Sequence, residues 1–315
     1  MILAVIGLTF THGTQAQPSS SRIPLDGLVS FWDFQETTGA FIAKLGAGPY
    51  ALEAQVYDNT TKEWSPGSVD RVQDAPPGNP FGSQSARIAF GQLLVVPETA
   101  TKAPLLNIHG DNATLSVVVW MKADSRFVNA TGPSTNFGHL AGIWSEPYEA
   151  RRYVVFGRNP RGKPCPTCTS LDVEVSRTGT SEPPCRWSIS YAVGSANVTF
   201  EEWHVVALTF DGKEIRSYVN GTLDVRPPHR INPPSDPCNE TWANPAQVAT
   251  WSNRSSWGPG GDPTYPQQVT DFAVGGQKAA EDKTYGHPWT GLVGGLAVYS
   301  RALEPAELAA MAASS

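Results

Sequence analysis

Residues 203–221 read Trp203-His-Val-Val-Ala-Leu-Thr-Phe-Asp-Gly-Lys-Glu-Ile-Arg-Ser-Tyr-Val-Asn-Gly221, and this stretch decides the fold class of the 315-residue chain. Two β-rich runs flank Asp211-Gly212, a pattern that predicts a hairpin of two strands. Because Asp and Gly both accept positive φ angles, we expect a type I′ turn at this dipeptide. A second turn is predicted at Asn220-Gly221.

Short apolar runs separated by Gly, Pro and Asn recur along the rest of the chain. Further strands are predicted at Ala86–Phe90, Leu93–Val96, Thr114–Met121, Tyr153–Phe156, Leu171–Ser176 and Trp187–Val193. The one predicted helix is Pro305–Ala312, with Pro in its first turn and Glu304 and Glu307 near its N-terminus. The pattern predicts an all-β, two-sheet antiparallel sandwich with a short C-terminal helix, in one domain over residues 17–315.

Three further segments carry a resemblance to a known family. They are Gly27-Leu-Val-Ser-Phe-Trp-Asp-Phe-Gln-Glu-Thr-Thr-Gly39, Phe272-Ala-Val-Gly-Gly276 and Gly291-Leu-Val-Gly-Gly-Leu-Ala-Val-Tyr-Ser-Arg-Ala-Leu303. Together with the hairpin they resemble the laminin G-like (pentraxin-like) jelly rolls of the concanavalin A-like lectin and glucanase superfamily. Asn107-Ile-His-Gly, Ala141-Gly-Ile-Trp-Ser-Glu146 and Arg152-Tyr153 are similar to segments of short secreted laminin G-like proteins of planctomycete type. The resemblance implies a jelly roll and leaves the function open, because the superfamily contains lectins, adhesion modules, glycosidases and polysaccharide lyases.

The N-terminus predicts secretion. Residues 1–16 combine an apolar run, Ile2–Phe10, with the small-residue cleavage site Thr14-Gln15-Ala16, as in a signal peptide. No other apolar run approaches the roughly 18 residues of a membrane span, so we expect no membrane insertion. The net charge of −6 argues against nucleic acid as a partner. The sequence therefore predicts a soluble extracellular protein.

The four cysteines, Cys165, Cys168, Cys185 and Cys238, predict two disulfides in a secreted chain. Three connectivities are open, and we expect one of Cys165 and Cys168 to bond with Cys185 and the other with Cys238. Zinc is the alternative for Cys165-Pro-Thr-Cys168, but no second such pair completes a site.

Acceptor sequences for N-glycosylation exceed what composition predicts; they lie at Asn59, Asn112, Asn129, Asn197, Asn220, Asn239 and Asn253. Turn chemistry at these Asn residues is the alternative. A long Pro- and Trp-rich loop is predicted at about residues 226–268. Its Trp242, Trp251 and Trp257 suit either sugar stacking or anchoring of the loop.

A concave glycan-binding face is predicted around two clusters. Asp172 and Glu174 alternate with core-facing residues, so they either form a carboxylate pair or lie on a solvated strand face. The second cluster places the Trp144 ring beside Glu146 and Arg152. Arg152 suits a sugar carboxylate or sulfate, or it pairs with Glu146 in a structural ion pair. The glycan-binding candidates are Trp144, Glu146, Arg152, Tyr153, Asp172, Glu174 and Arg186.

The leading function is a secreted lectin-like or adhesion module that binds a glycan or polysaccharide. A carbohydrate-active enzyme on the same face, a polysaccharide lyase or an atypical glycoside hydrolase, is the alternative. Its catalytic candidates are Glu146, Tyr153, Asp172 and Glu174, and His139 is the one histidine to test. No cofactor is required. Family members often carry acidic calcium ligands where this chain has Gly294-Gly295, so calcium would need Asp33, Glu36 or backbone carbonyls. The sequence leaves the oligomeric state open.

Overall fold

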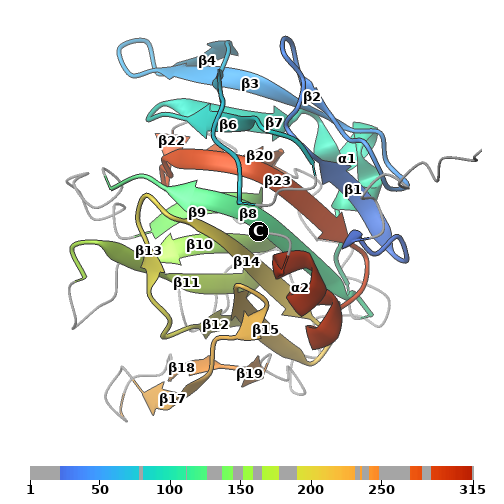
Figure 1. Cartoon of the computed structure of the whole chain (residues 1–315), viewed down its shortest axis with the longest axis vertical. Coiled ribbons are helices and arrows are strands. Elements are labelled where there is room, and N and C mark those ends of the chain that lie inside the picture. The colour runs from blue at the N-terminus through green and yellow to red at the C-terminus, as the bar shows by residue number, and fades with distance from the viewer. Residues whose placement is uncertain are drawn as a thin grey trace, which may run out of the picture.

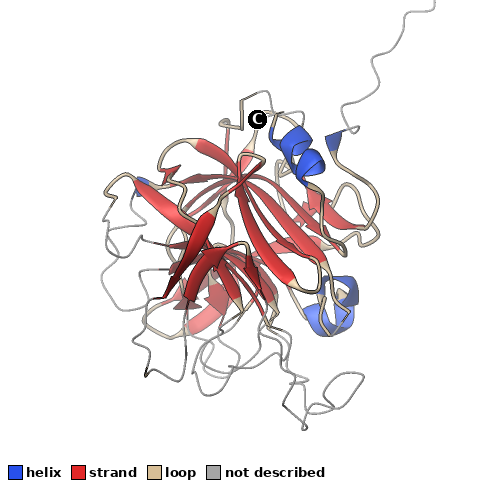
Figure 2. Cartoon of the chain, turned by 90° about the horizontal axis from the view of Figure 1, so that it is seen from below, coloured by secondary structure: helices blue, strands red, loops and turns tan. Residues whose placement is uncertain are grey.

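The computed structural model describes residues 22–77, 81–110, 112–125, 137–144, 152–158, 165–176, 190–230, 235, 241–247, 270–278 and 285–313. Within these residues the chain forms two large antiparallel sheets stacked as a sandwich (Figures 1 and 2). The nine-stranded sheet contains β1 (Leu28–Trp32), β5 (Asp70–Val72), β6 (Ser85–Ile88), β8 (Leu115–Ala123), β14 (Trp203–Phe210), β15 (Glu214–Val219), β16 (Thr222–Leu223), β19 (Ala246–Gln247) and β23 (Gly291–Tyr299).

The ten-stranded sheet contains β2 (Phe41–Ile42), β3 (Ala51–Asp58), β4 (Glu63–Pro66), β7 (Gln92–Val96), β9 (Phe137–Ile143), β10 (Tyr153–Arg158), β11 (Cys168–Val175), β12 (Tyr191–Val193), β13 (Val198–Thr199) and β20 (Phe272–Val274). Its main path runs β12-β11-β10-β9-β20-β7-β3-β2. The path of the nine-stranded sheet runs β16-β15-β14-β8-β23-β6-β5. The described residues also form two ribbons, β17 (Arg226–Arg230) with β18 (Thr241–Asn244), and β21 (Gln277–Lys278) with β22 (Tyr285–Gly286). The predicted sandwich is confirmed.

Alternating side chains explain the sandwich. In β8, Val117, Val119 and Met121 point into the core between the sheets, while Val118 and Trp120 point to the opposite side. Strands with this period of two bury one row of residues against the other sheet and leave the second row for another layer.

Helix α2 (Pro305–Ala312) supplies that layer on the nine-stranded sheet and has the predicted bounds. Its Leu308 and Met311 are buried against the outer face of this sheet. A capping box joins Glu304 and Glu307, and the Glu307 carboxylate accepts hydrogen bonds from Arg301 at 2.6 and 2.8 Å. Two short helices, α1 (Thr99–Lys102) and η2 (Pro104–Leu106), lie between β7 and β8 in sequence.

The hairpin of β14 and β15 is confirmed, but the predicted type I′ turn at Asp211-Gly212 is wrong. Of these two residues, Gly212 has a positive φ (91°) and Asp211 does not. Asp211 Oδ1 instead accepts hydrogen bonds from the backbone N–H groups of Lys213 (2.9 Å) and Glu214 (2.8 Å). The side chain therefore mimics a backbone turn and lengthens the loop.

The second predicted turn has the geometry of type I′. Asn220 and Gly221 have φ values of 49° and 74°, and Val219 pairs with Thr222 across them. Asn220 Oδ1 accepts a hydrogen bond from the N–H of Val205 (2.9 Å), which ties this turn to β14.

The predicted long loop contains β17, β18 and β19, so it is not structureless. Pro227 and Pro228 lie within β17, although two consecutive prolines in a sequence argue against a strand. Proline is tolerated here because β17 has β18 as its one partner among the described residues, so prolines do not interrupt a central ladder. No helix in the described part of the chain has the length and hydrophobicity that a membrane crossing requires.

Candidate functional site

The outer face of the ten-stranded sheet, the side away from the nine-stranded sheet, gathers part of the predicted site. Leu171, Val173 and Val175 of β11 lie in the core as predicted, which directs Asp172 and Glu174 to the outer face. Trp144, directly after β9, packs with Val154 and Phe156 of β10 on the same face.

Asp172 belongs to a buried ion pair that the sequence did not predict. Arg158 Nη1 donates to Asp172 Oδ2 at 2.6 Å, and the two side chains are 5% and 1% exposed. The solvated strand face considered for Asp172 is therefore wrong, whereas Glu174 is partly exposed. Phe156 pairs with Asp172 across β10 and β11, and Arg158 lies two residues further along the same face.

Trp242 covers this ion pair. The Arg158 guanidinium carbon lies 4.4 Å from the centroid of the Trp242 ring, and that of Arg226 lies 4.9 Å from it. Trp242 is buried with Tyr191 and Val193 of β12, so it anchors the β17–β18 ribbon to the sheet. Of the two roles considered for Trp242, the structure supports anchoring.

Arg226 differs from Arg158 in its partners. It is partly exposed, and its Nη1 donates to the carbonyl of Gly194 at 3.1 Å. Among the described residues no carboxylate forms an ion pair with it. Burial and the neighbouring Arg158 cation lower the pKa of Arg226 from its ordinary value. We refer to Arg158, Asp172, Glu174, Arg226 and Trp242 as the Arg226 cluster.

Arg152 and Tyr153 bond through their side chains to the segment at Leu106 and Asn107. Tyr153 points into the core, where its hydroxyl donates to the carbonyl of Leu106 at 2.7 Å, and burial raises its pKa above the ordinary value. Arg152 is buried, and its Nε donates to Asn107 Oδ1 at 2.8 Å. A base must reach the proton that it removes, and a fully buried Tyr153 does not meet this requirement. Glu146 and Arg186 lie outside the described residues.

His139 is buried below Phe156 on the outer face. Its Nε2 lies 3.2 Å from the carbonyl oxygen of Ala273, and its ring meets Phe156 edge-on. Burial, together with the nearby His287, lowers the pKa of His139 to about 3. The imidazole is therefore neutral over the physiological range and occupies a structural position.

The structure joins Cys165 to Cys168 in one disulfide. The expected pairing of these residues with Cys185 and Cys238 is therefore wrong; the latter two lie outside the described residues. A turn separates Cys165 from Cys168 and leaves their Cα atoms 5.3 Å apart, within the range that a disulfide spans.

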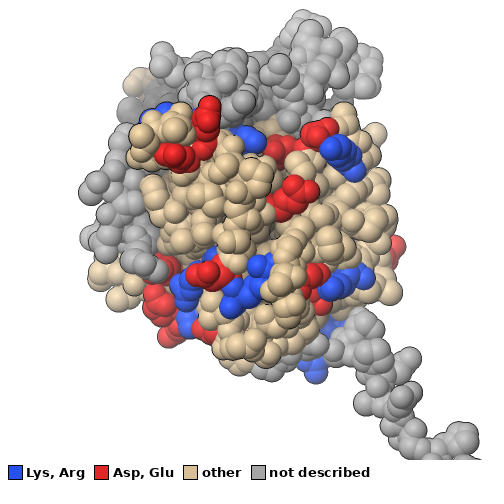
Figure 3. All heavy atoms as spheres, turned by 90° about the horizontal axis from the view of Figure 1, so that it is seen from above, with Lys and Arg blue, Asp and Glu red and all other residues tan. Residues whose placement is uncertain are grey.

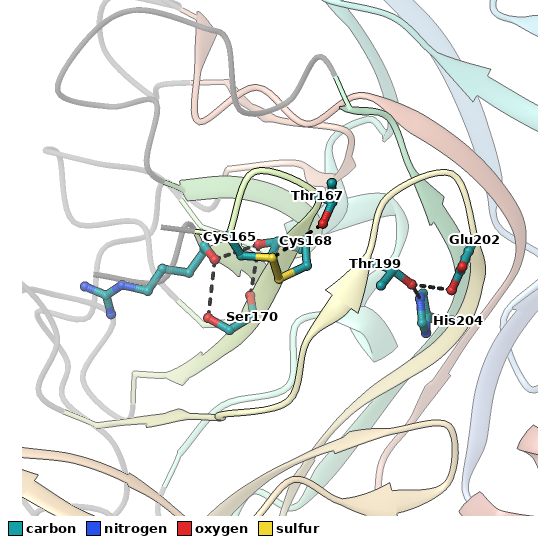
Figure 4. Close-up of a disulfide and its surroundings, with 9 residues drawn as sticks. Cys165, Thr167, Cys168, Ser170, Thr199, Glu202 and His204 are labelled. Atoms are coloured by element: carbon teal, nitrogen blue, oxygen red, sulfur yellow. Dashed lines mark hydrogen bonds between the residues drawn. A yellow bond between two sulfur atoms is a disulfide. The ribbon is translucent and has the colours of Figure 1, made fainter. Parts of the chain in front are cut away.

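A hydrogen-bonded chain lies beside this disulfide (Figure 4). Thr199 pairs with Cys168 across β13 and β11, and its hydroxyl bonds to Glu202 and to His204 Nε2 (2.9 Å). Burial lowers the pKa of His204. These bonds fix the start of β14, so His204 occupies a structural position.

The residues considered for calcium already have partners. Lys44 Nζ lies 2.7 Å from Glu36 Oε1, and Asp33 Oδ1 accepts a hydrogen bond from the backbone N–H of Gln35 at 3.2 Å. Among the described residues no three His, Cys, Asp or Glu side chains converge to hold a metal ion. Gly295 packs on Trp120, and a Cβ at this position would lie 2.9 Å from the ring. A glycine therefore fits here better than the acidic residue of the resembling family.

The acceptor asparagines differ in their surroundings. Asn59, Asn112, Asn197 and Asn220 are all exposed. Asn220 uses both ends of its amide, because Oδ1 accepts from Val205 and Nδ2 lies 3.2 Å from His204 Nδ1. The remaining acceptor sites lie outside the described residues: Asn129, Asn239 and Asn253.

No protein-family model matches the chain, and no curated protein matches its sequence. Several solved structures are similar in fold. Domain 4 of an extracellular arabinanase from Geobacillus stearothermophilus, in complex with arabinotriose, is 14% identical with a TM-score of 0.49; the match covers 90% of this chain and 98% of that one. Trypanosoma rangeli sialidase in complex with 2,3-difluorosialic acid is 14% identical with a TM-score of 0.49, over 92% of this chain and 33% of that one.

The receptor binding domain of a botulinum neurotoxin C/D mosaic is 10% identical with a TM-score of 0.45, covering 91% of this chain and 51% of that one. Similarity at this level does not assign a function to the chain. The laminin G-like assignment stays a prediction.

Proposed function

We propose that the chain is a secreted glycan-binding module that uses the outer face of its ten-stranded sheet. One observation carries the proposal: Arg226 is a partly exposed cation without an ion-pair partner among the described residues, held against Trp242 and near Asp172. A guanidinium donates several hydrogen bonds in a fixed plane, and a carboxylate accepts bonds from hydroxyl groups. Such donors and acceptors suit sugar hydroxyls and sugar carboxylates.

Arg226 is held in a fixed position before any ligand binds. Trp242 and Arg158 are buried, and the Trp242 ring holds the partly exposed Arg226 in place. Groups fixed before the ligand arrives lose little conformational freedom on binding.

Catalysis on the same face is the second candidate, because β11 directs both Asp172 and Glu174 outward. Glycosidases use two carboxylates, one of which must exchange protons with the substrate. Asp172 is buried and already bonded to Arg158, whereas Glu174 is partly exposed. Glu174 is therefore the carboxylate that a substrate could reach for proton transfer.

The test incubates the protein with insoluble and soluble polysaccharides, neutral and acidic, and measures both its depletion from solution and the products by mass spectrometry. We expect depletion without products, and we expect Arg226→Gln to weaken binding about tenfold or more, since a hydrogen bond to a charged group contributes roughly 1.5–3 kcal/mol. Arg216→Gln, on β15 of the other sheet, is the matched control. Products that disappear in Glu174→Gln would assign an enzyme instead.

A further inference from the structure

Four aromatic rings meet at the β3–β4 end of the ten-stranded sheet, far from the Arg226 cluster. Tyr57 of β3 and Trp64 of β4 have ring centroids 5.0 Å apart, and Tyr285 of β22 lies 6.0 and 5.6 Å from these two rings. Phe90, in the loop between β6 and β7, lies 5.4 Å from Tyr285. We refer to these four residues as the aromatic platform.

Local pairing builds the aromatic platform. Tyr57 is the direct partner of Trp64 across β3 and β4, so their side chains share one face of the sheet. The Tyr285 ring lies over Gly276, where a Cβ would come within 2.5 Å of the ring. Trp64 and Tyr285 rest on the buried Leu93, Val95 and Ala273 of the outer face.

The rings are not sealed from solvent. Phe90 is 66% exposed, the largest exposed fraction among the large apolar side chains that the structure describes, and the other three rings are partly exposed. An apolar side chain left in water forgoes the free energy that its burial would release. A ligand that covered Phe90 and its three aromatic neighbours would therefore remove apolar surface from water.

Polar groups beside the rings can orient such a ligand. Gln55 lies two residues before Tyr57 on the same side of β3, and Lys278 pairs with Tyr285 across β21 and β22. Lys278 Nζ lies 3.4 Å from Gln55 Oε1 and 3.9 Å from Asp271 Oδ2. Because Asp271 balances the charge of Lys278, the rim supplies donors and acceptors without an excess of either charge.

The wider surface agrees with this balance. Figure 3 views the molecule from above the β3–β4 edge, and its acidic and basic side chains are interspersed rather than gathered in a field of one sign. A surface of this kind gives a polyanion no long-range attraction.

We propose that the aromatic platform is a second glycan-binding site, for neutral sugars in the pyranose form. The apolar C–H face of the sugar would stack on one exposed ring and meet the tilted rings beside it at its edges, and its hydroxyl groups would exchange hydrogen bonds with Gln55 and Lys278. All four platform side chains are aromatic, and the negative faces of aromatic rings attract polarised C–H groups, which aliphatic side chains do not.

The aromatic platform and the Arg226 cluster lie at opposite ends of one face. Five steps along the path from β11, which carries Asp172 and Glu174, to β3, which carries Tyr57, separate them, roughly 24 Å at about 4.8 Å per strand. The platform rests on its own contacts, so it would bind whether or not Arg226 does. Two sites on one polymer would raise the overall affinity without any new contact.

The experiment measures retardation of the protein in native gels that contain a soluble neutral β-glucan, at low and at high salt. We expect Trp64→Ala and Phe90→Ala each to weaken retardation about threefold to tenfold, because aromatic contacts contribute roughly 0.5–1.5 kcal/mol. High salt is expected to leave the wild type unchanged, since no charge on the ligand is involved. Leu25→Ala, which removes an equally exposed apolar side chain elsewhere, is the control.

The Phe90→Ala variant keeps the test independent of folding, because Phe90 is mostly exposed and its removal leaves the core intact. Retardation that Phe90→Ala does not change, in a protein with wild-type thermal stability, would overturn the platform. Retardation that high salt abolishes would also overturn it. Loss in Arg226→Gln alone would support the proposed function and reject the second site.

Discussion

Arg158 donates to Asp172 at 2.6 Å in a buried ion pair on the outer face of the ten-stranded sheet. Removing one partner leaves an uncompensated buried charge, so we expect Asp172→Asn to lower the free energy of unfolding by about 3–5 kcal/mol. Replacing both residues by Leu is expected to cost less than the two single changes together. Urea denaturation measures these values. Additive single and double effects would show that the ion pair does not couple the two residues.

Protonation of His139 links stability to pH. Its pKa lies at about 3 in the folded protein against an ordinary value of 6.5, so only the unfolded state takes up a proton between these values. Stability therefore falls as the pH falls below about 6.5, with a slope of up to about 1.4 kcal/mol per pH unit from this residue. His204, whose pKa is also lowered, contributes in the same direction.

Denaturation curves at several pH values, for the wild type and for His139→Gln, measure this slope. The variant is expected to flatten the curve. A slope that is identical in the two proteins would refute the assignment to His139.

The turn at Asn220-Gly221 also supports helix α2. Gly221 has a φ of 74°, and a Cβ there would lie 2.7 Å from Ala309 Cα. Gly39 has a similar φ of 72° but open space around it. Gly39→Ala therefore isolates the backbone strain, about 1 kcal/mol, and Gly221→Ala should cost at least about 1 kcal/mol more. Equal losses in thermal stability would mean that α2 moves aside freely.

Glycan occupancy is expected to follow the freedom of the Asn amide nitrogen, which carries the sugar. Asn59, Asn112, Asn197 and Asn220 are all exposed, and Asn59 Oδ1 accepts from Lys62, but in Asn220 both amide atoms are held, by Val205 and His204. In protein from a eukaryotic secretory host, peptide mass spectrometry should find sugar on the first three and none on Asn220. Full occupancy of Asn220 would show that this hairpin forms after glycosylation.

The fold was largely predictable because its signals are local. Alternation in residues 203–221, the Asn220-Gly221 turn and the helix at Pro305–Ala312 each lie within one short segment. The β17–β18 ribbon was not predicted, since Pro227-Pro228 breaks a strand pattern and Trp242 anchors the ribbon only through tertiary contacts.

The site was less predictable because its contacts join distant segments of the chain. A period of two placed Asp172 and Glu174 on one face, but their surroundings come from elsewhere in the chain: Arg226 follows them by some fifty residues. The aromatic platform joins β3, β4, the loop before β7 and β22, which only the order of strands in the sheet brings together. No spacing within a single segment signals it.

Depletion of the protein from solution by insoluble polysaccharides tests whether the outer face binds glycans. Purified wild-type protein and Arg226→Gln are mixed with a panel of neutral and acidic polymers, and the protein left in solution is measured. If the outer face binds glycans, at least one polymer depletes the wild-type protein from solution without releasing products. The same polymer depletes Arg226→Gln less. Wild-type protein that stays in solution with every polymer would contradict glycan binding, and equal retention of Arg226→Gln would contradict the site.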